Sequence, residues 1–92
     1  MATLLSDSDI QAKLKQLPGW ERDGKTIKSE RTFQGFIEAI QFVNSLVQPA
    51  ESAGHHPDLF ISYNKVTIHL TSHDAGGLTE KDFQMADTIS AL

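Results

Sequence analysis

The sequence predicts an α+β fold in which a four-stranded antiparallel sheet carries three helices packed on one face, in the order αββαββα. Three observations predict it. Three segments repeat apolar residues every three or four positions, two pairs of short segments look like hairpin strands, and a turn signal separates the members of each pair. Strands joined by short turns pair antiparallel, and each helix must bury its apolar side, so the helices are expected to cover the sheet.

Length and composition indicate a single small domain, expected to span residues 1–92. With 39% apolar and 22% charged residues, the chain is too apolar to be disordered. It contains no cysteine, which excludes disulfides, thiolate metal sites and a thiol nucleophile. Its eight Lys and Arg residues are spread along a chain of net charge −4, so no basic stripe indicates direct binding of nucleic acid.

Neither a membrane segment nor a secretory signal is recognisable in the sequence. No apolar run approaches the roughly 18–20 residues that span a bilayer. Residues 1–7 lack the basic and apolar regions of a signal peptide. We therefore expect a cytoplasmic protein that does not bind membranes. A chain this short buries a limited fraction of its surface, so we also expect a subunit partner.

A first helix is predicted over residues 7–16. Ser6 can cap its first turn, and Asp9 occupies the position that completes a capping box. The apolar stripe of this helix consists of Ile10, Leu14 and Leu17. Pro18-Gly19 ends the segment, because proline cannot continue a helix and glycine favours its termination.

The first predicted hairpin begins at Trp20-Glu21-Arg22, turns at Asp23-Gly24 and returns over residues 25–33. Neither side of the return strand is continuously apolar, since charged and hydroxyl residues interrupt both. This pattern predicts an edge strand or a half-exposed strand.

The second helix is predicted over residues 36–54. Its apolar side is expected to consist of Phe36, Ile40, Val43, Val47 and Ala50. Pro49 lacks a backbone donor, so we expect a kink at 45–48 or a new short helix with Pro49 in its first turn. Gly54 suits the end of this helix.

The second predicted hairpin has strands at 59–63 and 66–71, joined by a turn at Asn64-Lys65. Apolar and polar residues alternate along the return strand, which predicts that Val66 and its same-side neighbours face the core. The last helix follows the loop 72–77 and is capped by Thr79. Leu78 and Phe83 flank that cap at the positions of a hydrophobic staple. The apolar side of the last helix is expected to consist of Met85, Ile89 and Leu92.

Histidines offer the clearest chemistry in the chain, at positions His55, His56, His69 and His73. The residues before the first strand of a hairpin and after its second strand meet at the open end. Counting outward from a turn at Asn64-Lys65 places His56 opposite His73, with His55 beside them. Imidazole can both give and take a proton near neutral pH, so such a group suits general acid–base catalysis.

Further side chains could support this cluster. Glu51, one helical turn before His55, and Asp82 could fix the orientation or the tautomer of an imidazole. Trp20 and Phe60 could form a flat apolar wall for a planar ligand. Trp20 also has a structural interpretation, as a core residue of the first hairpin.

Two other functions stay open on the residues alone. Three histidines and a water could hold zinc in a metal-dependent hydrolase, although adjacent side chains diverge and rarely meet at one ion. A small chain with an edge strand could instead be a non-catalytic module that assembles with a partner. His69 is expected to be structural, on the polar side of its strand.

Four blocks of sequence resemble the signature of the pterin-4a-carbinolamine dehydratases. The blocks are Glu51-Ser52-Ala53-Gly54-His55-His56-Pro57-Asp58, Tyr63-Asn64-Lys65-Val66, Leu70-Thr71-Ser72-His73 and Gly77-Leu78-Thr79-Glu80-Lys81-Asp82. The similarity extends from Trp20 to Ile89. Departures from the residues usual in that family stand at Pro49, Gly54 and Ser72, and none of them removes a histidine.

The resemblance implies dehydration of 4a-hydroxytetrahydrobiopterin to quinonoid dihydropterin and water, in tetrahydrobiopterin recycling, with no metal or organic cofactor. It implies catalytic roles for His55, His56 and His73, supported by Glu51 and Asp82. Positions that match pterin-lining residues of the family are Pro57, Ser72, Asp74 and Ala75. The family's fold is a four-stranded antiparallel sheet with helices on one face, and its members form homodimers or homotetramers.

Overall fold

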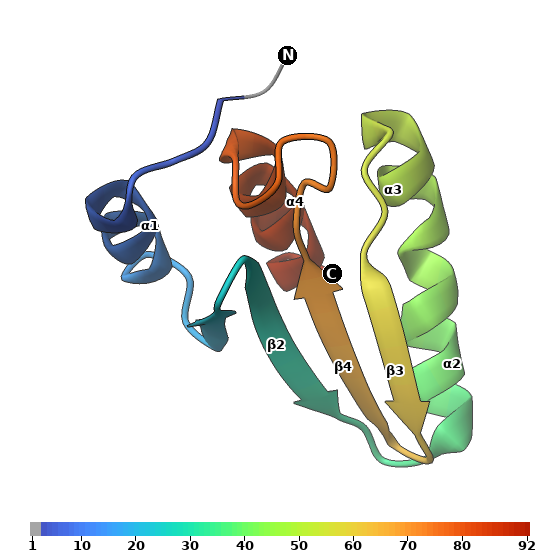
Figure 1. Cartoon of the computed structure of the whole chain (residues 1–92). Helices are drawn as coiled ribbons and strands as arrows, with labels where there is room; N and C mark the ends of the chain where they lie inside the picture. Colours follow the sequence, from blue (N-terminus) through green and yellow to red (C-terminus); the bar gives the residue numbers. More distant parts are fainter. Residues whose placement is uncertain (1–2) are drawn as a thin grey trace.

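The computed structural model describes residues 3–92, so Met1 and Ala2 of the segment considered for a signal lie outside it. Its elements are α1 (Asp7–Leu14), β1 (Trp20–Asp23), β2 (Thr26–Thr32), α2 (Phe36–Ser45), α3 (Val47–Ala53), β3 (Asp58–Ser62), β4 (Lys65–Leu70) and α4 (Glu80–Ser90). The strands form one antiparallel sheet in the order β1-β2-β4-β3. Figure 1 shows α2, α3 and α4 behind this sheet and α1 beside it. The α+β class and the antiparallel sheet are confirmed. None of the helices described is long and apolar enough to cross a bilayer.

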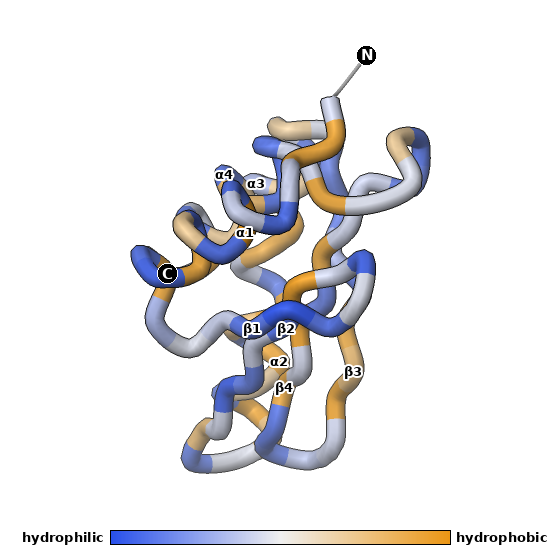
Figure 2. Tube along the Cα trace, turned by 60° about the vertical axis from the view of Figure 1, so that its left-hand side comes forward, coloured by the Kyte–Doolittle hydropathy of each residue, from blue (hydrophilic) through white to orange (hydrophobic). Residues whose placement is uncertain are grey.

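One face of the sheet forms the core. Hydrophobic residues alternate with more hydrophilic ones along β4, as Figure 2 shows. On β4, Val66, Ile68 and Leu70 are at most 1% exposed, which confirms the predicted core side. A single cluster joins them to Trp20 and to buried residues of α1, α2 and α4.

Both hairpin turns lie one residue away from their predicted positions. Asp23 pairs with Thr26, so the first turn is Gly24-Lys25, with Gly24 at φ +61°. Ser62 pairs with Lys65, so the second turn is Tyr63-Asn64. The Asn64 side chain donates to the Phe33 carbonyl at 2.9 Å, and the Phe33 N–H donates to the Asn64 carbonyl. These bonds hold Asn64 against the β2–α2 connection and thereby fix the turn one position earlier.

Of the two alternatives predicted for the return strand of the first hairpin, the edge position is wrong, because β2 pairs with both β1 and β4. The half-exposed alternative is confirmed, since most residues of β2 are partly exposed. Arg31 is a charged residue on the core-facing side of β2, and its guanidinium finds hydrogen-bond partners within the protein. The Arg31 guanidinium donates to the carbonyls of Ile89 and Leu92 at the end of α4 and lies over the ring of Phe42 at 4.6 Å. A cation at a helix C-terminus is favourable, so this position tolerates a charge that a pattern of apolar residues cannot anticipate.

The long predicted helix is divided in two at Leu46. Pro49 is the third residue of α3, which confirms a new short helix with proline in its first turn. Gly54 ends α3 in the left-handed conformation at φ +61°, as expected. The predicted apolar side is right in part, since Ala50 is 5% exposed and Val43 packs against the core. Phe36 and Val47, in contrast, are 52% and 59% exposed. The other buried residues of this segment, outside the predicted set, are Ala39, Phe42 and Leu46.

The predicted helix caps are confirmed. The Ser6 hydroxyl accepts from the Asp9 N–H, although α1 ends at Leu14, two residues earlier than expected. Thr79 caps α4, and the flanking residues Leu78 and Phe83 are both buried. Met85 and Ile89 face the core as predicted, whereas Leu92 is half exposed.

Candidate active site

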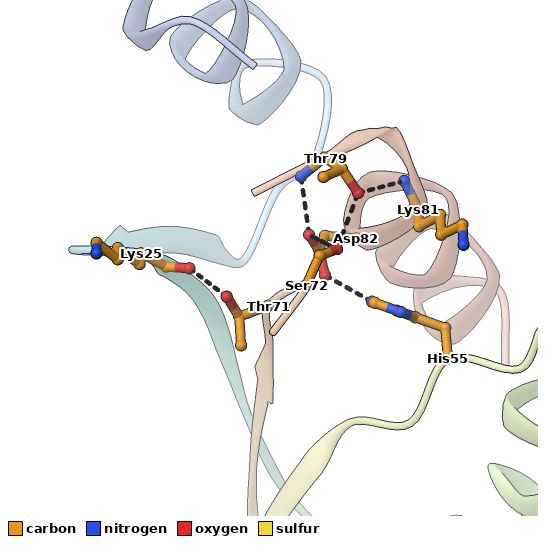
Figure 3. A network of polar contacts seen from close by, with 7 residues as sticks. All are labelled: Lys25, His55, Thr71, Ser72, Thr79, Lys81 and Asp82. Carbon is orange, nitrogen blue, oxygen red and sulfur yellow. Dashed lines mark hydrogen bonds and ion pairs between the residues drawn. The ribbon is translucent and has the colours of Figure 1, made fainter. Parts of the chain in front are cut away.

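A completely buried carboxylate, that of Asp82, lies where three segments meet (Figure 3). Asp82 is in the first turn of α4, Ser72 follows β4, and His55 follows α3. One Asp82 oxygen, Oδ2, accepts from the Ser72 hydroxyl at 2.8 Å and from the Thr79 N–H at 2.9 Å. The other oxygen, Oδ1, lies 2.6 Å from Nε2 of His55. A charge this deep needs several donors. The Ser72 hydroxyl and the Thr79 N–H supply two, and the His55 ring nitrogen lies where a third donor would stand.

The hydroxyl groups around Asp82 form a directional chain. A serine hydroxyl has a single proton, and Ser72 donates its proton to Asp82. The 2.8 Å contact between the Ser72 and Thr79 hydroxyls therefore has Thr79 as its donor. Thr79 in turn accepts from the Lys81 N–H at 3.2 Å. Each bond in this chain points toward the carboxylate, and successive bonds of this kind polarise one another.

The end of α3 places His55 beside that carboxylate. Gly54 reverses the chain, and the His55 N–H donates back to the Ala50 carbonyl at 3.1 Å. The imidazole is mostly enclosed, with its side chain 12% exposed. It lines a cavity of about 470 Å³ between α3 and α4, to which Lys81 and Met85 also contribute. A mostly enclosed imidazole with one nitrogen beside a buried carboxylate can exchange a proton at the other nitrogen.

The next residue, His56, belongs to a different environment. Its Nε2 contacts the Glu51 carboxylate at 2.5 Å, and both side chains are largely exposed. It lines a more apolar cavity of about 250 Å³ between α2, α3 and β3, together with Pro57 and Leu59. Successive side chains of an extended segment point to opposite sides, which explains why neighbouring histidines have different partners.

The predicted pairing of His56 with His73 is wrong. Because the second turn is Tyr63-Asn64, Asp58 pairs with His69, and the same register continued outward places His55 opposite Ser72. His73 is exposed in the loop that follows β4, and it lines neither of the two cavities. The fold thus brings His55 to Asp82 and His56 to Glu51. His73 follows Ser72 in the sequence, and its side chain has no hydrogen-bond partner among the described residues.

The residues predicted to contact a ligand are divided by the structure. Pro57 lines the cavity of His56, and Asp74 and Ala75 lie in the loop that carries His73. Ser72, in contrast, is 2% exposed, and its hydroxyl is engaged by Asp82 and Thr79.

The proposed flat wall of Trp20 and Phe60 does not form at these histidines. Trp20 is a core residue that donates to the Ser90 hydroxyl at 2.9 Å, near the far end of α4 from Asp82. Phe60 packs edge-on against His69, with 5.3 Å between ring centroids. His69 lies on a strand and is partly exposed there, in line with its structural interpretation.

No three His, Asp or Glu side chains within residues 3–92 cluster so that they could hold a metal ion. The histidine zinc site considered from the sequence therefore does not assemble in the described part of this chain. The contribution of Thr79 to the site was missed, although its signal was present. A threonine cap followed three residues later by aspartate predicts reciprocal bonds, and here that aspartate also holds His55.

A family model described as "Pterin 4 alpha carbinolamine dehydratase" matches residues 3–92. The chain belongs to this family. The resemblance inferred from the four sequence blocks is thereby confirmed, and the segments of the Asp82 network fall within three of those blocks.

Individual relatives agree with the family assignment. A Nostoc sp. protein, provisionally named a pterin-4-alpha-carbinolamine dehydratase, is 61% identical over 92 residues, which are 100% of this chain and 99% of that protein. A crystal structure from Brucella melitensis, titled "transcriptional coactivator/pterin dehydratase", is 32% identical with a TM-score of 0.90 and covers 95% of both chains. A pterin dehydratase-like protein identified as a RuBisCO assembly factor in the alpha-carboxysome is similar at a TM-score of 0.67 and 22% identity, over 79% of this chain and 87% of that one. That last likeness concerns the fold alone.

Proposed function

We propose that this protein, acting as a single domain over its whole length, is a 4a-hydroxytetrahydrobiopterin dehydratase that serves tetrahydrobiopterin recycling. The observation that carries this proposal is the contact between the His55 imidazole and the buried Asp82 carboxylate, within a chain of the dehydratase family. The reaction breaks the bond between C4a and its hydroxyl oxygen. That oxygen leaves as water after it takes up a proton, N5 loses its proton, and the N5–C4a double bond forms. No oxidant, metal or organic cofactor enters this balance.

The proposed mechanism uses histidines as the acid and the base. His55 and His73 transfer the protons, and His56 holds or polarises the pterin ring. Each general acid or base contributes about 10²–10⁴-fold to the rate. Asp82 orients His55, and Glu51 orients His56, in support of this proposal. Pro57, Asp74 and Ala75 are proposed to line the pterin, and the burial of Trp20 with its bond to Ser90 supports a structural role for that residue.

Replacement of the histidines tests this proposal directly. We expect His55→Ala and His73→Ala each to lower the rate of carbinolamine dehydration, followed by pterin absorbance, by about 100-fold or more. His69→Ala is the matched control, because it removes an imidazole that packs on Phe60 and contacts neither Asp82 nor Glu51. Equal rates for wild type and both site variants would contradict the proposal.

We also propose that the chain acts in the cytoplasm as a homodimer or homotetramer. β3 is an edge strand of the sheet, and its residues Phe60 and Ile61 are 60% and 42% exposed. The start of α2 exposes Phe36 and Ile37 as well. Apolar side chains beside unpaired strand groups favour association with another strand. Light scattering coupled to gel filtration measures the mass, and a mass of one chain at micromolar concentration would contradict the oligomer.

The alternative function is a non-catalytic oligomeric module, which the same exposed apolar residues favour. The Brucella structure is titled both coactivator and dehydratase, and the carboxysome protein is an assembly factor. A chain that assembles normally but does not accelerate dehydration above the rate in buffer would favour this alternative. A dehydration rate that depends on His55 would exclude it as the sole function.

A further inference from the structure

Ser72 connects the two halves of the candidate site. Its backbone closes the loop 72–77, because the Ser72 N–H donates to the Gly77 carbonyl at 3.0 Å. The Ser72 carbonyl accepts from the N–H groups of Ala75 and Gly76 at 3.1 and 3.0 Å. The loop that carries His73 is thus anchored at Ser72. On its side-chain end, the same residue donates to the carboxylate that contacts His55.

We propose that Ser72 is a positioning residue that fixes His55 in one tautomer through Asp82, with the proton on Nε2 and the free electron pair on Nδ1. The role of this tautomer in catalysis rests on the proposed dehydratase function. The tautomer itself follows from the contacts around Asp82. The resemblance to the family implies that Ser72 lines the pterin, whereas its burial and its contacts favour the positioning role.

The two oxygens of Asp82 have different partners. Oδ2 is occupied by the Ser72 hydroxyl and the Thr79 N–H, which leaves Oδ1 for His55. With the carboxylate fixed in this way, a neutral imidazole without a proton on Nε2 would hold its electron pair against Oδ1 at 2.6 Å. Two acceptors at that distance repel each other, so the proton stays on Nε2.

Removal of the Ser72 hydroxyl would loosen this arrangement. Oδ2 would then keep only the Thr79 N–H, and the Thr79 hydroxyl would lose its acceptor. The carboxylate could rotate about its Cβ–Cγ bond, and the His55 ring would lose a fixed partner. Direct contact between the Ser72 hydroxyl and a substrate does not fit the structure, because the residue is 2% exposed and its hydroxyl already has two partners.

The experiment compares Ser72→Ala with Ser72→Thr, which keeps a hydroxyl group. Nitrogen-15 NMR of the imidazoles, at a pH where His55 is neutral, distinguishes the Nε2–H tautomer from the Nδ1–H tautomer. We expect the wild type and Ser72→Thr to hold His55 with Nε2 protonated, and Ser72→Ala to show a mixture. In the dehydration assay, Ser72→Ala should lower kcat by about tenfold and leave KM nearly unchanged, since the hydroxyl orients a catalytic group and does not contact substrate.

Ser90→Ala is a matched control for the loss of one bonded serine hydroxyl. Ser90 lies at the other end of α4, where its hydroxyl accepts from Trp20. This variant should lose stability without changing the His55 tautomer. Circular dichroism verifies that every variant is folded. A His55 tautomer that is the same in Ser72→Ala and wild type would overturn the proposal. An increase in KM at constant kcat would also overturn it, in favour of substrate contact.

The NMR result separates this proposal from the proposed function. A tautomer shift in Ser72→Ala with an inactive wild type would support the positioning role and contradict the dehydratase. An active wild type whose tautomer does not respond to Ser72→Ala would support the dehydratase and contradict the positioning role.

Discussion

Two adjacent histidines each contact a carboxylate, yet their surroundings differ completely. The Asp82 carboxylate that contacts His55 is 0% exposed and also accepts from a hydroxyl and a backbone N–H. The Glu51 carboxylate that contacts His56 is 68% exposed, and His56 itself is 60% exposed. An exposed ion pair is screened by water and salt, whereas a buried carboxylate must keep its donors or leave a charge without compensation. The same kind of contact therefore holds the His55 imidazole more firmly than it holds the His56 imidazole.

The largest expected effect is that of Asp82→Ala. This change leaves the Ser72 hydroxyl and the Thr79 N–H without their acceptor and removes the Asp82 half of the α4 capping box, so the free energy of unfolding should fall by about 2–4 kcal/mol. Chemical denaturation measures that loss. Asp82→Asn, which retains the side-chain size, should lower kcat by about 10–100-fold in the folded protein. Unchanged stability and rate in these variants would show that the buried His55–Asp82 contact matters no more than the exposed His56–Glu51 contact.

A moderate effect is expected at Gly54, which precedes both histidines. Its φ of +61° is costly for other residues, and an added Cβ would meet nothing within 4 Å. Gly54→Ala should therefore cost about 1–2 kcal/mol through backbone conformation alone. Gly24→Ala is a matched control with the same φ and the same free space, in a turn between β1 and β2. Both variants should lose similar stability, and only Gly54→Ala should also lower kcat. A loss of activity in both variants would mean that activity depends on overall stability and not on how Gly54 orients the histidines.

The smallest effect is expected for Glu51→Gln. An exposed pair of this kind contributes about 0–1 kcal/mol, so thermal unfolding should change little. Salt screens exposed charges over about 8 Å at physiological ionic strength, so 0.5 M NaCl should reduce the difference in thermal stability between Glu51→Gln and wild type further. The loss of thermal stability in Asp82→Asn should persist in the same salt. An equal effect of salt on both losses of stability would show that burial does not distinguish the Glu51 and Asp82 carboxylates.

Local signals in the sequence predicted much of the fold. Ser6, Thr79 and Gly54 mark helix ends because their caps depend on a few neighbouring residues. The register of the second hairpin was less accessible, because it depends on bonds between Asn64 and Phe33, which are far apart in the chain. A turn displaced by one residue changes which residues pair across the hairpin, so Asp58 pairs with His69 and the register expected to bring His56 opposite His73 does not form.

The candidate site was predicted in its residue types and only partly in its contacts. Asp82 was recognised as a possible partner of an imidazole, and it contacts His55. Ser72 was assigned to the substrate, because a pattern of residues does not reveal which hydroxyl in a loop is buried. The core position of Arg31 was also hidden, since its partners are carbonyl groups at the end of a distant helix.

The decisive measurement is the rate of carbinolamine dehydration by the purified wild-type chain, compared with the rate in buffer. We expect an acceleration that His55→Ala reduces by about 100-fold and His69→Ala leaves intact. A folded wild-type protein that produces no acceleration, or one whose acceleration survives the loss of His55, would contradict this expectation.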